Sequence, residues 1–302
     1  MTTRKMHDDE IDIDEVLVRR LVAAQFPRWR ELPVTAVPSS GTDNAMYRLG
    51  PDMAVRLPRR PVAALQVAKE QLWLPRMAPR LPAAIPVPLA RGAPQEGYPF
   101  DWSVCRWVTG ETLLEGGNGA VLAQALARFI CALREIDTTG APRPGQHNFG
   151  RGEPLIRRDG ITRRSIAALE GEIDTTAVVA AWDADSAAAA WHGAPVWVHG
   201  DLSAANLLAK DGTLCGVIDF GGLAIGDPAA DIFVAWSLFD RDVRGVFRAV
   251  LDADDASWAR GRGWALALAL VAMPYYRQTN PPLVARARHV IGEILADHRD
   301  EG

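Results

Sequence analysis

Residues 196–222, VWVHGDLSAANLLAKDGTLCGVIDFGG, constrain the fold more than any other part of this sequence. They set Asp201, Asn206 and Asp219 among apolar runs, where polar and charged groups are costly unless they find partners. The run that precedes Asp201 is typical of a strand ending in a turn. Asp201 is therefore expected on a loop at the end of a strand.

A tight hairpin is predicted between Asn206 and Asp219, because an Asp-Gly pair between two apolar runs is a strong hairpin signal. A two-residue loop pairs Lys210 with Thr213. Counting back along both strands pairs Asn206 with Val217. The ribbon therefore returns Asn206 to the side of Asp219, with Asp201 one loop away.

Two carboxylates and a carboxamide that converge on one spot make an oxygen-rich site. Mg²⁺ prefers oxygen ligands and commonly takes one or two carboxylates together with phosphate oxygens. Without a cation or another counter-charge, two carboxylates in a partly dry site raise each other's pKa. The pattern therefore predicts Mg²⁺ held by Asn206 and Asp219, with Asp201 beside it.

Composition is typical of an ordinary soluble protein. With 302 residues, of which 48% are hydrophobic and 23% charged, the chain can bury a large core and divide into two lobes. A net charge of −4 gives no general attraction for nucleic acid. Three widely spaced cysteines do not form a disulfide framework.

No membrane partner is expected either. The apolar stretch 264–276 is too short to cross a bilayer and holds Pro274, so it is interpreted as a buried helix. The N-terminus is polar and acidic, unlike a signal peptide, which predicts a cytoplasmic protein.

The pattern of apolar residues and turn residues divides the chain into two parts. Before residues 106–110 we expect a helix over 13–26, an antiparallel meander over 34–57, a helix over 63–73 closed by Pro75, and a strand in the run FDWSVCRWV. After them the pattern is mostly helical, with helices over 120–136 and 177–190 and a loop over 140–165. The predicted lobes are 1–108, rich in strands, and 109–302, mainly helical.

The motifs HGDLSAAN, VIDFGG and IGDPAAD, in this order, resemble the catalytic segment of the aminoglycoside phosphotransferase family. These are small-molecule kinases with a protein-kinase-like fold. The strand-rich first part and the helical second part of the chain suit such an α+β, two-lobed architecture. The resemblance implies that Asp201 is the catalytic Asp, which orients the acceptor hydroxyl and takes its proton. It places Asn206 and Asp219 at the metal-ligand positions, and the spacing of Asp201 and Asn206 equals that of the kinase catalytic loop.

For the nucleotide, the resemblance points to ATP bound by the first lobe. The segment MAVR has the rhythm of the kinase strand that carries a phosphate-binding lysine, and it puts Arg56 in that place, with Glu70 as its acid partner. Ser40, Gly41 and Asn44 are candidate phosphate-binding residues of the covering loop. Arg106 and Val108 flank the expected adenine-binding hinge.

Three further residues near the catalytic segment are expected to be structural. His199 is interpreted as a residue that holds backbone carbonyls, and Asp227 as a helix cap before Pro228. Asp231 is expected to brace the catalytic loop by accepting backbone hydrogen bonds.

The acceptor is a small molecule with a hydroxyl group, and several kinds stay open. Acidic residues at 240, 242, 252, 254 and 255 would suit a cationic aminoglycoside, although five arginines between 151 and 164 change the local field. Aromatic residues at 236, 258, 264, 275 and 276 would suit a bulky alcohol if they do not belong to the core. A metabolic kinase for choline, a sugar or homoserine and a pseudokinase without transfer are the alternatives, and the sequence leaves the oligomeric state open.

Overall fold

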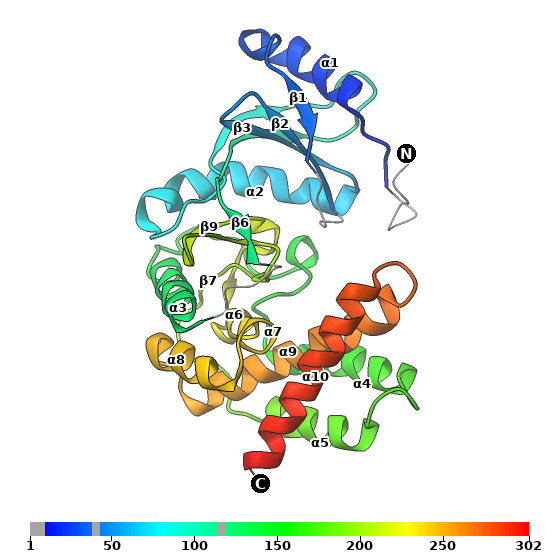
Figure 1. Cartoon of the computed structure of the whole chain (residues 1–302), viewed down its shortest axis with the longest axis vertical. Helices are drawn as coiled ribbons and strands as arrows, with labels where there is room; N and C mark the ends of the chain where they lie inside the picture. The colour runs from blue at the N-terminus through cyan, green and yellow to red at the C-terminus, as the bar shows by residue number, and fades with distance from the viewer. Residues whose placement is uncertain (1–9, 38–42, 114–118, 302) are drawn as a thin grey trace.

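The computed structural model describes residues 10–37, 43–113 and 119–301. Figure 1 shows two lobes, a smaller one that holds the N-terminal part of the chain and a larger one built mainly of helices. The predicted α+β, two-lobed fold is confirmed. The boundary at residue 108 stays a prediction.

The smaller lobe is a five-stranded antiparallel sheet with two helices. Its strands are, in sheet order, β1 (Val34–Ala36), β2 (Asn44–Leu49), β3 (Met53–Pro58), β5 (Trp102–Arg106) and β4 (Pro88–Gly92). Helix α1 (Glu15–Gln25) begins at Asp14, whose carboxylate accepts a hydrogen bond from the Leu17 amide at 2.8 Å. Helix α2 (Pro61–Met77) lies between this sheet and the larger lobe (Figure 1).

Pro75 does not close the second helix as predicted, because α2 runs on to Met77 and a 3₁₀ turn (Ala78–Arg80) follows. The missing amide of a proline removes a single intrahelical hydrogen bond. That loss is small where the helix is about to end anyway.

Two short sheets carry the loops between the lobes. One pairs β7 (Val196–Val198) with β10 (Ala224–Gly226), and the other has the order β6 (Glu111–Thr112), β8 (Leu207–Lys210) and β9 (Thr213–Val217). Asp211 and Gly212 form the predicted turn, with φ of 52° and 73°. These left-handed values are what a two-residue hairpin loop requires.

Helices form the rest of the larger lobe. They are α3 (Ala120–Arg134), α4 (Asp159–Ala168), α5 (Thr175–Ser186), α6 (Ala229–Ile232), α7 (Val234–Leu238), α8 (Arg241–Leu251), α9 (Asp255–Tyr276) and α10 (Pro281–Glu301). The predicted loop over 140–165 is wrong in part, because it contains the start of α4 and the 3₁₀ turns Gln146–Asn148 and Leu155–Arg158. The glycines and prolines of this segment led to the prediction of a loop, although part of it is helical.

The apolar core has two parts. One fills the smaller lobe around Leu49, Val55 and Trp102, and the other fills the larger lobe. Trp73 of α2 belongs to the second part, since its ring centroid lies 4.6 Å from that of Trp197 on β7. Helix α2 is thus fastened to the larger lobe by buried aromatic contact. In the described part of the chain, no helix is long and apolar enough to cross a membrane.

Candidate active site

The loop after β7 is held from behind by a buried carboxylate. Asp231 accepts hydrogen bonds from the amides of His199, at 2.8 Å, and Gly200, at 2.7 Å. The side chain of Asp231 is fully buried, where a carboxylate needs such donors. Its predicted bracing role is confirmed.

His199 is buried and structural, as expected. Its Nδ1 accepts a hydrogen bond from the Asp201 amide at 3.2 Å, and its Nε2 lies 3.2 Å from the carbonyl oxygen of Ile218. Burial lowers the pKa of His199. The neutral ring therefore ties the Asp201 loop to the residue that precedes Asp219.

Gly200 allows this loop to come very close to the Asp219 turn. Its φ is +79°, and a Cβ atom there would lie 2.7 Å from the carbonyl oxygen of Gly222. Both the backbone angle and the contact require glycine. The glycine in the motif HGD is thus explained by geometry.

Asp201 and Asn206 contact each other directly. The Nδ2 atom of Asn206 donates to the Asp201 carbonyl oxygen at 2.8 Å and to its Oδ2 at 3.0 Å. The Asp201 residue is exposed by its accessible surface, yet many protein atoms surround its carboxylate. This loss of hydration, followed by the charge of Asp219, raises the pKa of Asp201 to about 7, while Arg151 and Asn206 act in the opposite sense.

The hairpin brings Asn206 even closer to Asp219 than the sequence predicts. A β-bulge shifts the register between Leu208 and Ala209, so Val217 pairs with Leu207 and the predicted pairing of Asn206 with Val217 is wrong. The carbonyl oxygen of Asn206 instead accepts a hydrogen bond from the Ile218 amide at 2.9 Å. Asp219 follows at once, with a left-handed φ of 61°.

Arg56 of β3 connects the lobes through two carboxylates. Its Nη1 donates to Glu70 of α2, and its Nη2 donates to Asp219 Oδ1 at 3.0 Å and to Gln66 Oε1 at 3.3 Å. Burial disfavours the charged guanidinium, but the two carboxylates outweigh it and hold the pKa of Arg56 above its usual value. The predicted Arg56–Glu70 pair forms, and the planar fork adds Asp219 as a second partner.

Lys69 is a site residue that the sequence reasoning missed. Its ammonium group donates to the carbonyl oxygens of Gly221, at 2.8 Å, and Leu223, at 2.9 Å, and lies 3.0 Å from His147 Nδ1. Burial lowers the pKa of Lys69 to about 8. Together with Gln66 against Gly221, Lys69 fixes the turn after Asp219 to α2. The one feature of the sequence that could have pointed to Lys69 is its position next to Glu70, the predicted partner of Arg56.

The other residues predicted to bind the nucleotide differ in burial, and two of them lie outside the described residues. Ser40 and Gly41 lie outside the described residues. Asn44 begins β2 and is buried, and its Oδ1 has no hydrogen-bond partner among the described residues. Arg106 is exposed at the end of β5, and Val108 is buried where a side chain at Gly216 would clash with it.

The oxygen atoms around Asp219 fit a hard cation. Because Nδ2 of Asn206 points to Asp201, its Oδ1 is left as the free end of the amide, and Asp219 Oδ2 accepts no hydrogen bond from the described residues. Within residues 10–37, 43–113 and 119–301 no group of three or more His, Cys, Asp or Glu could hold a metal. An amide and one carboxylate that share Mg²⁺ with phosphates need no such group.

Several of the acidic and aromatic residues suggested for the acceptor have structural roles. Asp240 and Asp254 cap α8 and α9, and Asp255 pairs with Arg248. Trp236 is buried, and its Nε1 donates to Asp297 at 2.7 Å. Asp227 accepts from the Ala229 amide at 3.0 Å, but Arg260 is its main partner, at 2.8 Å.

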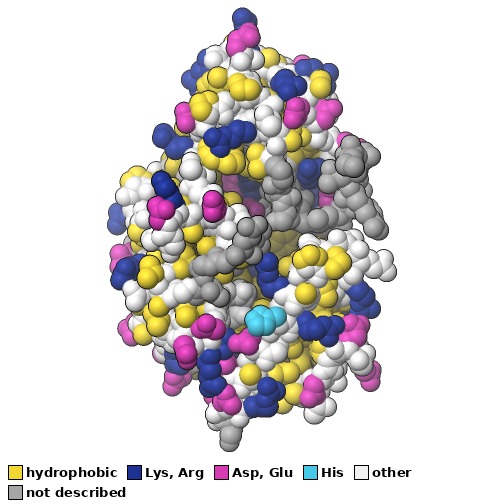
Figure 2. Space-filling model, in the orientation of Figure 1, with side chains coloured by type: hydrophobic (Ala, Val, Ile, Leu, Met, Phe, Trp, Pro, Cys, Tyr) yellow, Lys and Arg dark blue, Asp and Glu magenta, His cyan; other side chains and the backbone are white. Residues whose placement is uncertain are grey.

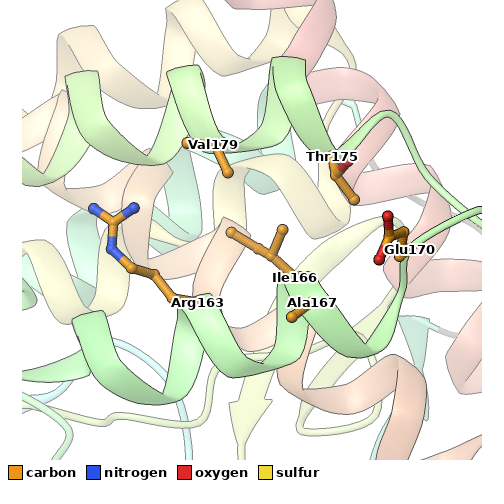
Figure 3. Close-up of a pocket in the computed structure, with 6 residues that line it drawn as sticks. All are labelled: Arg163, Ile166, Ala167, Glu170, Thr175 and Val179. Atoms are coloured by element: carbon orange, nitrogen blue, oxygen red, sulfur yellow. The ribbon is translucent and has the colours of Figure 1, made fainter.

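A separate open groove of about 330 Å³ lies between α4 and α5 (Figure 3). Its lining residues are Arg163, Ile166, Ala167, Glu170, Thr175 and Val179. None of the candidate site residues borders it, and Arg163 is paired with Asp159 and Asp183. The candidate site lies instead where Arg56 of the smaller lobe meets Asp219 of the larger lobe, and Figure 2 shows the surface hollowed between the two lobes.

Solved structures with this architecture are phosphotransferases. Aminoglycoside 2'-phosphotransferase-IIIa in complex with GDP aligns with a TM-score of 0.72 and 19% identity over 95% of this chain and 100% of that one. Macrolide 2'-phosphotransferase MphH from Brachybacterium faecium gives 0.62 and 21% over 93% and 98%. The ternary complex of streptomycin, ATP and APH(2")-IIa gives 0.58 and 17% over 95% and 97%.

The chain thus has the fold of these phosphotransferases. The sequence profile of the phosphotransferase enzyme family (APH) matches residues 34–264, and the chain belongs to that family. The resemblance found in the motifs is confirmed. None of the curated proteins compared with the chain matches it.

Proposed function

We propose that this phosphotransferase moves the γ-phosphate of ATP, bound with Mg²⁺, to a hydroxyl group of a small molecule at Asp201. The observation that carries the proposal is the convergence of Asp201, Asn206 and Asp219, with Arg56 joining Asp219 to Glu70. Phosphoryl transfer depends on positioning and charge neutralisation more than on a covalent nucleophile. This set of residues supplies both.

Asp201 is the proposed base. A carboxylate whose pKa is raised to about 7 can take a proton from a hydroxyl near neutral pH and release it afterwards. The hydrogen bond from Asn206 holds Oδ2, which leaves Oδ1 for the acceptor. Asp231 and His199 keep the loop in place from the buried side.

Asn206 Oδ1 and Asp219 Oδ2 are the proposed metal ligands. Bound Mg²⁺ would neutralise phosphate charge and hold the phosphate oxygens. The left-handed backbone at Asp219 and the grip of Lys69 on the following turn orient this carboxylate. Arg56 holds the other Asp219 oxygen and balances the local negative charge.

ATP is proposed on the first lobe, against Arg56, Asn44 and the segment from Arg106 to Val108. The Oδ1 of buried Asn44 has no partner among the described residues, which supports a ligand at that edge of β2, since buried polar atoms are seldom left unsatisfied. Neighbouring structures that contain GDP or ATP support a nucleoside triphosphate donor in general. The choice of ATP rests on the family resemblance.

The experiment is a coupled assay of Mg²⁺-dependent ATP consumption with a panel of amino sugars, macrolides and simple alcohols. We expect turnover that needs Mg²⁺ and at least one hydroxyl acceptor, and that disappears in Asp201→Asn. ATP binding without turnover for every acceptor would instead support the pseudokinase alternative.

A further inference from the structure

Two arginines beside the catalytic loop, Arg151 and Arg158, form no ion pair with a described carboxylate, although Asp201 and Asp231 attract Arg151 from a greater distance. The Nε of Arg151 donates to the Gly200 carbonyl oxygen at 2.9 Å, one residue before Asp201. The nearest contact of Arg158 is a long hydrogen bond of 3.4 Å from Nη1 to the Phe149 carbonyl oxygen, and its buried Nε has no partner. Among the described residues, no carboxylate forms an ion pair with either side chain.

Arg151 and Arg158 are half-buried, and the arginines that are fully buried in the described part of the chain are neutralised. Arg244 pairs with Glu293 and Asp297, Arg260 pairs with Asp227, and Arg56 pairs with Glu70 and Asp219. Unpaired buried charges are expensive, so such pairing is the rule. Arg151 and Arg158 depart from it together, at the edge of the proposed site.

Both guanidinium groups face the ring of Trp264 on α9. The Cζ atoms of Arg151 and Arg158 lie 6.0 Å and 5.1 Å from its centroid. Trp264 is fully buried, and its Nε1 has no hydrogen-bond partner among the described residues. The same is true of Thr162 Oγ1, one helical turn after Arg158. Arg158 Nε, Trp264 Nε1 and Thr162 Oγ1 thus all lack a hydrogen-bond partner among the described residues.

The local charge is positive and poorly hydrated. Burial, followed by the charge of Arg151, lowers the pKa of Arg158 to about 10, with Glu153 opposing. Burial also lowers the pKa of Arg151, against the attraction of Asp201 and Asp231. Arg134 likewise forms no ion pair among the described residues, and its charge is attracted by Asp231 and Asp227, so Arg158 is the arginine of this group with the weakest acidic surroundings.

Asn148 fixes this arrangement to the catalytic loops. Its Nδ2 donates to the carbonyl oxygens of Arg151, at 2.8 Å, and Gly222, at 3.2 Å, and its Oδ1 accepts from the Gly145 amide at 2.9 Å. The fully buried Asn148 thus joins the arginine-bearing loop to the turn after Asp219. A ligand held by the arginines would have a defined distance from Asp201.

From these contacts we infer that Arg151, Arg158 and Trp264 form an acid-binding subsite, and that the acceptor carries a carboxylate or phosphate group besides its hydroxyl. Guanidinium groups bind such anions through paired, charge-assisted hydrogen bonds, and the indole Nε1 adds one more donor. The anion supplies the missing counter-charge and directs the hydroxyl to Asp201. A polycationic aminoglycoside would be repelled here. This inference rests on the proposed function for the identity of the reaction.

The first test needs no turnover. Thermal unfolding of the full chain is measured in saturating Mg-ADP, with and without malonate, a dicarboxylate that has no hydroxyl. Malonate is expected to raise the Tm of the wild type and of Arg157→Gln, but not that of Arg158→Gln. Arg157 is the matched control because it is exposed on the same 3₁₀ turn. An equal shift in all three proteins, or none in the wild type, overturns the inference.

The second test compares glucuronate, glucose and glucosamine as acceptors. Glucuronate should give the highest kcat/KM, and Arg158→Gln should raise its KM about tenfold to a hundredfold, the usual loss for a charge-assisted hydrogen bond. Arg157→Gln should keep the wild-type KM. A preference for glucosamine contradicts an acid-binding subsite. Failure to consume ATP with any acceptor counts against the proposed function instead, because the malonate shift does not depend on turnover.

Discussion

The arginines on the two sides of the candidate site differ in their ion pairs with carboxylates. On the nucleotide side, Arg56 is buried between Glu70 and Asp219, so its charge is balanced by the fold itself. On the proposed acceptor side, Arg151 and Arg158 both face the Trp264 ring, and neither forms an ion pair with a carboxylate of the described residues. A balanced cation stabilises the folded chain, whereas an unbalanced one is available to a ligand at a cost in stability.

The largest expected effect is the loss of turnover in Asp201→Asn. The amide cannot accept the proton of the hydroxyl, and loss of a general base typically costs about 10²–10⁴-fold in rate. The measurement is kcat with the best acceptor of the panel. Asp211→Asn, at the tip of the neighbouring hairpin, is the control and should keep full activity. Similar kcat values for Asp201→Asn and wild type would remove Asp201 from the reaction.

The next largest expected effect is a loss of stability when Arg56 loses one of its two carboxylate partners. Glu70→Gln removes the partner of a buried guanidinium, and breaking a buried ion pair costs about 3–5 kcal/mol. Because Asp219 remains as a partner of Arg56, the low end of this range is expected. Urea unfolding gives the free energy directly.

The control for Glu70 is Glu31→Gln, which breaks an exposed pair with Arg30. Pairs of this kind are worth about 0–1 kcal/mol. If both substitutions had the same small effect, the description of Arg56 as a buried, balanced cation would fail.

Substitution of Arg158, which forms no ion pair among the described residues, should have the opposite effect on the free energy of unfolding. Arg158→Gln removes a desolvated charge that has no acidic partner, so the free energy of unfolding in the absence of ligands should stay the same or rise. The same urea experiment measures it. A loss as large as that in Glu70→Gln would mean that Arg158 has a stabilising partner and is not held for a ligand.

A smaller effect is the pH dependence of stability at Asp201. Its pKa is raised to about 7 in the fold, so the folded chain binds the proton more tightly than the unfolded chain. The wild type therefore loses stability as pH rises from about 4, the usual pKa of Asp, to about 7, and Asp201→Asn escapes this loss. In EDTA, the Tm advantage of Asp201→Asn should be larger at pH 8 than at pH 5. An advantage that does not change with pH would show an ordinary pKa.

Much of the fold followed from local signals in the sequence. Asp211 and Gly212 predicted the hairpin because their chemistry fits the left-handed turn directly. The bulge that moves Val217 opposite Leu207 left no such mark, since an extra residue in a strand looks like any other. The register error was one residue, and Asn206 still pairs through its backbone with Ile218, the residue before Asp219.

The site was predictable where a motif or an elimination applied. Glu70 was found because few acids lie near Arg56 in the sequence, but the contact of Arg56 with Asp219 joins residues 163 positions apart and has no local signal. Arg151 and Arg158 were missed for a similar reason. Their segment looks like a basic loop, and only the position of Trp264 from α9 gives the two charges a common direction.

The most direct test of the central claim is titration calorimetry of ATP with Mg²⁺ and with EDTA, on the wild type, Asp219→Asn and Asp211→Asn. Both aspartates have left-handed backbones, which asparagine tolerates, so neither substitution should strain the chain. We predict that Mg²⁺ tightens ATP binding by the wild type and by Asp211→Asn, and that this gain disappears in Asp219→Asn. An unchanged gain in Asp219→Asn would contradict a magnesium–nucleotide site built on Asn206 and Asp219.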